Sequence, residues 1–240
     1  MGFMEKPYVK VITYALILTL SLFIAKLIDV KAIHLDICTL IVKIIAIFVM
    51  IAYIKKNEIK VINKCDPKYY AFISLPAILV LILKFNGFSR HVHFGIFMLG
   101  FLQVIASVIV AELLYRAINT HLLAPNSYNV KNIVIVTAVY TLSFIFDAFF
   151  IGLEASIIQL ITVCAFSLFL LGLYVRTDNI VVPTLAHFAF SAMMWLCGTP
   201  YASKGGIGRV SYVFIYTLMI VLYTVCGVIM LRKEAKETIN

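Results

Sequence analysis

Three ionisable side chains within apolar stretches of this 240-residue sequence have types and spacings that could support chemistry. Glu112 and Arg116 are four residues apart, so a helix would place them on one face within reach of an ion pair. His187 lies near the middle of a later apolar stretch, where its imidazole needs a polar partner. A structural ion pair and a packed histidine are the alternatives to a functional role.

A fourth candidate is Asp147, which has no basic residue within one helical turn. Inside a membrane an ionisable side chain costs about 2.5–3.5 kcal/mol at the bilayer centre, which makes each such residue a candidate for function. Lys26 lies near the end of an apolar stretch and is expected to extend toward the lipid headgroups. Lys43 is expected to do the same or to pair with Asp36.

The composition indicates that a lipid bilayer surrounds the elements that carry these residues. The chain is 63% hydrophobic and 13% charged, with a mean hydropathy of +1.06. Soluble domains are about 45–50% apolar and about 25% charged. The formal net charge of +9 comes from short basic blocks beside apolar runs, a pattern that orients membrane spans and excludes nucleic-acid binding as the main function.

Apolar stretches of about 20 residues predict an all-α, polytopic membrane protein with a bundle of about eight transmembrane helices. The expected spans are residues 9–28, 37–54, 69–85, 94–115, 132–152, 155–175, 179–197 and 212–231. With this division, thirteen of the 20 Lys and Arg residues fall on the side of the two termini and five on the other side. The bias predicts that both termini are cytoplasmic. Fifteen lysines against five arginines are typical of low-GC bacteria, which favours a bacterial plasma membrane.

The motif Glu112-Leu-Leu-Tyr-Arg116, together with His187 in a Pro-x-x-x-His span, resembles the CPBP family. This family of membrane proteins includes the CAAX prenyl endopeptidases and many bacterial proteins linked to bacteriocin processing or immunity. The resemblance divides the chain into N-terminal transmembrane helices (1–93), a CPBP-like core (94–197), and a last transmembrane helix with a cytoplasmic tail (198–240).

The family pattern is EExxxR on one helix, FxxxH on the next, and HxxxN or a close variant on a later one. In active members, the resemblance implies that the first Glu and first His activate a water, while the second His and the Asn stabilise the oxyanion. Glu112 and Arg116 match the second Glu and the Arg, and His187 matches the second His.

Three motif positions depart from this pattern: Ala111 replaces the base, Phe150 replaces the first His, and Ser191 replaces the Asn. Glu112 is a poor substitute for the base, because adjacent residues of a helix point about 100° apart. Asp147 precedes Phe150 by one turn, so its carboxylate would be displaced by about 5 Å along the axis. The departures predict that the fold is kept and the peptidase chemistry is lost.

Straight helices would place Glu112 near the side of the termini and Phe150 near the opposite side. To bring these positions together, the helix that begins at Phe94 must continue past Arg116 toward Leu123, or a helix must tilt or kink.

The sequence favours a non-catalytic binding or regulatory protein, for example one that sequesters a peptide, assembles with another membrane protein or confers bacteriocin immunity. One alternative is an active intramembrane endopeptidase that uses Glu112, Asp147 and His187. A second is a small transporter with Asp147, Lys43 and His187 along its path, although no internal repeat is present. No cofactor or metal site is expected, and the expected partners are the lipid bilayer and a peptide or another membrane protein.

Overall fold

The computed structural model describes residues 6–30, 36–83, 94–123, 129–151, 153–196 and 206–237. Within these ranges the chain is helical apart from short connections and contains no strand, as expected for an all-α protein. The elements are α1 (Pro7–Ile28), α2 (Ile37–Lys56), η3 (Pro67–Tyr70), α3 (Ala71–Leu83), α4 (Phe94–Ala111), η4 (Glu112–Ile118), α5 (Asn119–Leu123), α6 (Val130–Leu142), η5 (Ile145–Asp147), α7 (Ala148–Ile151), α8 (Leu153–Thr177), α9 (Val181–Leu196) and α10 (Gly206–Glu237).

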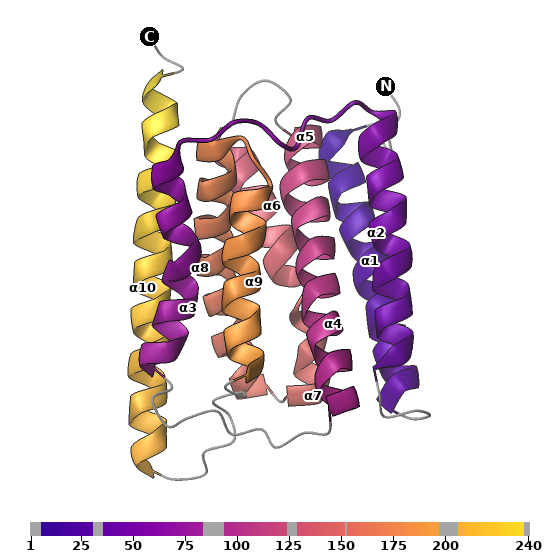
Figure 1. Ribbon diagram of the computed structural model, residues 1–240, viewed down its shortest axis with the longest axis vertical. Coiled ribbons are helices and arrows are strands. Elements are labelled where there is room, and N and C mark those ends of the chain that lie inside the picture. Colours follow the sequence, from indigo (N-terminus) through magenta and orange to yellow (C-terminus); the bar gives the residue numbers. More distant parts are fainter. Residues whose placement is uncertain are drawn as a thin grey trace.

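The long helices form one bundle with both termini at the same end (Figure 1). The charge bias of the sequence predicts one side of the membrane for both termini. Four helices are long and apolar enough to cross a membrane: α1, α2, the continuous helix Phe94–Leu123, and α8 from Ser156 onward. Large apolar side chains such as Phe48 and Val49 are more than half exposed, which lipid contact makes favourable.

Helix α8 packs against α6, α9 and α10. Its contact with α10 is close because a Cβ atom on Gly227 would meet backbone atoms of Leu168 at 2.8 Å. Small residues at such crossings allow two helix backbones to approach each other.

The helix that begins at Phe94 runs without a break to Leu123, which is the continuation that the motif geometry requires. Its middle part, η4, is a π-helix that starts at Glu112. Thr120 Oγ1 donates a hydrogen bond to the Tyr115 carbonyl at 3.0 Å, five residues earlier, which fits the wider turn. Such π-helical turns are frequent at functional sites.

The expected span 132–152 is not one helix. Helix α6 ends at Leu142, and the short helices η5 and α7 follow. Ser143 Oγ donates to the Tyr140 carbonyl at 2.6 Å, and Thr141 Oγ1 donates to the Thr137 carbonyl at 2.8 Å. These local bonds compete with the helical pattern, and apolar periodicity does not reveal them.

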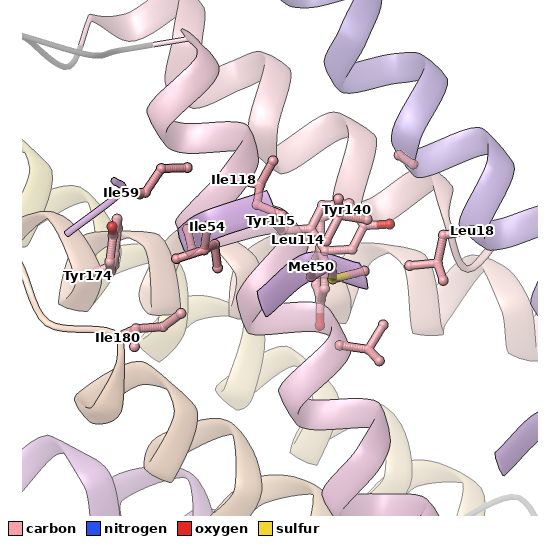
Figure 2. Close-up of a cluster of buried hydrophobic side chains, with 13 residues drawn as sticks. Leu18, Met50, Ile54, Ile59, Leu114, Tyr115, Ile118, Tyr140, Tyr174 and Ile180 are labelled. Carbon is pink, nitrogen blue, oxygen red and sulfur yellow. The ribbon is translucent and has the colours of Figure 1, made fainter. Parts of the chain in front are cut away.

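The core consists of clusters of buried hydrophobic side chains. One cluster joins α1, α2, η4, α6 and the end of α8, and Figure 2 shows Leu114, Tyr115 and Tyr140 packed within it. A second cluster lies between α3, α8, α9 and α10, around Phe166 and Tyr223. The first cluster surrounds η4, so the motif residues of η4 lie within the packed interior.

Candidate functional site

The three motif residues retained from the sequence meet in one buried cluster. His187 Nδ1 on α9 lies 2.7 Å from Glu112 Oε1 on η4. Arg116 Nη1 lies 3.5 Å from the same carboxylate oxygen. Glu112 and Arg116 are 1% and 0% exposed, so this carboxylate is held between a guanidinium and an imidazole away from solvent.

Two further helices, α6 and α8, contribute side chains that contact Arg116. Its guanidinium carbon lies 4.3 Å from the ring centroid of Tyr140 on α6, a cation–π contact, and its Nη2 donates to Ser167 Oγ on α8 at 3.4 Å. The Tyr140 ring also meets the His187 ring edge-on. Tyr140 therefore joins the cluster as a residue that sequence reasoning missed, because an aromatic residue in an apolar span carries no distinguishing signal.

Several buried polar atoms in this region have no hydrogen-bond partner among the described residues. They are Glu112 Oε2, Nε and Nη1 of Arg116, and both side-chain amide atoms of Asn119. Asn119 is 0% exposed and follows Arg116 by about one turn, so it extends the polar part of this helix. The cluster thus keeps hydrogen-bonding capacity that its neighbouring side chains do not use.

A cavity of about 350 Å³ lies beside the cluster, between α1, α2, α4 and the α6–α7 region. Ala111 and Phe150 both line it, so the two positions where the family motif has the base and the first His face a common space. The proximity of these positions, which the resemblance requires, is therefore present. At both positions the wall is hydrocarbon, a methyl group from Ala111 and a phenyl ring from Phe150.

Two lysines from the spans also line this cavity. Lys26 Nζ lies 4.2 Å from the ring centroid of Phe150, and Lys43 Nζ donates to Gln103 Oε1 at 2.6 Å. The side-chain amide of Gln103 donates in turn to the backbone carbonyl of Asp36. The sequence predicts extension toward the headgroups for Lys26 and the same, or a pair with Asp36, for Lys43; the structure places both side chains, and Asp36, in the lining of the cavity.

The cluster and the cavity share a boundary of two aromatic residues. Tyr140 contacts Arg116 and also lines the cavity. Tyr115 lines the cavity too, and its ring packs edge-on against the Tyr140 ring. Glu112 and His187 are not among the residues that line the cavity. The retained carboxylate and imidazole thus lie behind an aromatic layer, outside the space that Ala111 and Phe150 face.

Two sequence candidates remain, Ser191 and Asp147. Ser191 is half-buried on α9, one turn after His187. Asp147 is the last residue of η5, and its side chain lies outside the described part of the structure. The structure therefore brings together Glu112, Arg116 and His187, and separately Ala111 and Phe150.

A hydrogen-bonded carboxylate and imidazole can orient each other and transfer a proton when a reacting group lies within hydrogen-bond reach. Neither Ala111 nor Phe150 offers a proton acceptor to the cavity. Among the described residues, no group of three or more His, Cys, Asp or Glu side chains could hold a metal ion.

Comparison with known proteins gives one family match. Residues 93–193 match the family model described as Type II CAAX prenyl endopeptidase Rce1-like. No curated protein and no solved structure matches the chain. The matched segment contains Ala111, Glu112, Arg116, Phe150, His187 and Ser191. The chain is therefore a CAAX-protease-like membrane protein, and its residues 93–193 belong to the CPBP family.

Proposed function

We propose that this protein is a pseudoenzyme of the CPBP family, which binds a peptide or a segment of another membrane protein without cleaving it. The observation that carries the proposal is the hydrocarbon wall of the cavity at Ala111 and Phe150. Water activation needs a proton acceptor in contact with the attacking water, and general acid–base catalysis contributes about 10²–10⁴-fold. At these two positions the cavity offers no such group.

The buried cluster supports a structural role for the retained motif residues. Glu112 Oε1 is engaged by both His187 and Arg116, and Arg116 is in turn packed against Tyr140 and Ser167. A polar network of this kind fixes the arrangement of the helices that contribute to it. In the proposed function it keeps η4, α6, α8 and α9 in place around the binding cavity.

The cavity has the size and composition of a binding site. Ligand sites have volumes of about 300–1,000 Å³ and combine apolar walls with a few polar groups. Here the aromatic residues Phe23, Phe146 and Phe150 line the same cavity as the polar residues Thr39 and Gln103. Regulation of another membrane protein and immunity to a bacteriocin are the two roles that such binding would serve in a bacterial plasma membrane.

Peptide binding can be tested with the purified chain and a photoreactive prenylated peptide, the substrate class of the family's endopeptidases. We expect crosslinking to the wild-type chain and its loss in Ala111→Phe, which fills the cavity. Ala52→Phe is the matched control, because Ala52 is exposed on α2 outside the cavity lining. Equal crosslinking in Ala111→Phe and wild type would contradict binding in this cavity.

A second candidate is an active endopeptidase that uses Glu112, Asp147 and His187. The 2.7 Å contact between Glu112 and His187 favours it, since a carboxylate–imidazole pair can move a proton. This candidate predicts peptide cleavage by the unaltered chain, abolished by Glu112→Ala and also by Asp147→Asn. Retention of cleavage in either variant would contradict it.

A further inference from the structure

The connection between α2 and α3 is an extended segment whose residues alternate between the interior and the surface. Ile59 is 7% exposed and belongs to the cluster in Figure 2, where Tyr174 and Ile180 are also labelled. Val61 and Cys65 pack against the two core clusters. Successive side chains of an extended chain point to opposite faces, so residues 60, 62 and 64 point outward.

The outward side of this segment presents a lysine, an isoleucine and a second lysine. Lys60 and Lys64 are exposed, and Ile62 between them is 67% exposed. At about 3.3 Å per residue, neighbouring members of this row are about 7 Å apart. A cationic row with an apolar centre has the composition of a protein surface that lies at the boundary between headgroups and acyl chains.

Hydrogen bonds hold the segment against the turn between α8 and α9. The backbone N–H of Ile180 donates to the Val61 carbonyl at 2.8 Å. The Asn179 side chain donates to the Asn63 carbonyl, and Asn63 Nδ2 donates to Asp178 Oδ2 at 2.6 Å. Because its backbone is fixed at these points, the segment presents the row of lysine and isoleucine side chains in one orientation.

The position of the segment matches the surface of a bilayer. It runs across the end of the bundle that carries both termini, at the level where the apolar helices end (Figure 1). Lys55 and Lys56 at the end of α2 add exposed positive charge beside it.

Three carboxylates lie near this row. Asp66 forms an ion pair with Lys68 at 2.5 Å, and this hydrogen bond lowers the pKa of the Asp66 carboxyl. Asp178 accepts the hydrogen bond from Asn63, and Glu58 is exposed next to the buried Ile59. Lys68 balances the charge of Asp66, and the four exposed lysines Lys55, Lys56, Lys60 and Lys64 outnumber Glu58 and Asp178, so the row stays cationic.

We propose that Lys60, Ile62 and Lys64 form a binding site for the headgroups of anionic phospholipids in the adjacent leaflet. The two ammonium groups contact headgroup phosphates, and the Ile62 side chain inserts among the first carbons of the acyl chains. Juxtamembrane lysines attract anionic lipid by about fivefold each near the surface. The site is separate from the cavity, so the lipid-binding proposal does not depend on the proposed function.

The test uses the full chain in nanodiscs of phosphatidylcholine with a minor fraction of phosphatidylglycerol, and counts the retained lipids by native mass spectrometry. We expect Lys60→Gln/Lys64→Gln to lower phosphatidylglycerol retention by about fivefold or more. Lys55→Gln/Lys56→Gln is the control, with the same loss of charge outside the row, and we expect a clearly smaller loss of retention than in Lys60→Gln/Lys64→Gln, because no apolar side chain lies between these two lysines.

The Ile62→Ser variant tests the apolar contact, and we expect it to lower phosphatidylglycerol retention while all lysines remain. Circular dichroism and thermal unfolding in phosphatidylcholine check that each variant folds, since the altered side chains are exposed. An equal loss in both lysine pairs would overturn the proposal in favour of general charge attraction. Unchanged retention in Lys60→Gln/Lys64→Gln would also overturn it.

Discussion

The two sides of η4 differ in how tightly they are packed. On one side is α8, with 56% of its apolar stretch buried, in contact with α6, α9 and α10. On the other side are α1 and α2, with 22% and 17% buried, and the cavity between them and α4. The retained motif residues of η4 contact side chains of α6, α8 and α9 on the packed side. Ala111 and Phe150, in contrast, line the cavity.

The difference shows which part of a catalytic motif a fold needs for its own stability. Arg116 and His187 both contact Glu112 Oε1 within the protein, so the loss of Glu112 leaves a buried guanidinium and a buried imidazole without this partner. A base and an imidazole that face a cavity have water as their partner and can be replaced by hydrocarbon at little cost. This chain has such replacements at Ala111 and Phe150.

The largest predicted effect is the loss of the buried carboxylate. Glu112→Ala leaves the Arg116 guanidinium buried without its counter-charge, and we expect the free energy of unfolding to fall by about 3–5 kcal/mol. Denaturant unfolding of the purified protein in detergent measures it. Glu58→Gln removes an exposed carboxylate and should change stability by no more than about 0.5 kcal/mol. Equal effects in the two variants would show that the cluster does not hold the packed side together.

A second prediction concerns the close contact of α8 with α10. Gly227→Ala adds a methyl group that would meet the Leu168 backbone at 2.8 Å, and overpacking of this kind costs about 1–3 kcal/mol. The matched control is Gly95→Ala, where a Cβ atom would meet nothing within 4 Å. We expect thermal unfolding at lower temperature for Gly227→Ala only. A stable Gly227→Ala variant would mean that α8 and α10 can separate without loss.

The smallest predicted effect is on the cavity side. Phe150→Leu removes the cation–π contact with Lys26, which is worth about 1 kcal/mol at a half-exposed site. Denaturant unfolding under the conditions used for Glu112→Ala gives a direct comparison. A loss as large as that of Glu112→Ala would show that Phe150 is a core residue, and the contrast between the two sides would fail.

The all-α fold and the positions of most spans could be predicted from the sequence, because apolar stretches of bilayer length are a strong signal. The pairing of Glu112, Arg116 and His187 could be predicted as well, since their motif spacing and their chemistry agree. The need to bring motif positions together left two alternatives, a continuation of the helix past Arg116 toward Leu123 and a tilt or kink, and the structure has the continuation.

Other features had no signal in the sequence. The apolar pattern does not mark the break after Leu142, where Ser143 and Thr141 donate to local carbonyls, or the π-helix that begins at Glu112. The contact of Tyr140 with Arg116 and the position of Lys26 over Phe150 depend on how helices distant in sequence meet. Periodicity along one chain segment carries no information about such contacts.

The central claim is that hydrocarbon side chains, Ala111 and Phe150, occupy the two cavity positions where the family motif has its base and its first His. Its most direct test is mass-spectrometric detection of cleavage products after prolonged incubation of a prenylated peptide with the reconstituted chain. We predict an intact peptide with the wild-type chain, and fragments only with Ala111→Glu, Phe150→His and Ser191→Asn combined, which restores all three motif positions. Fragments produced by the wild-type chain and lost in Glu112→Ala would contradict the claim.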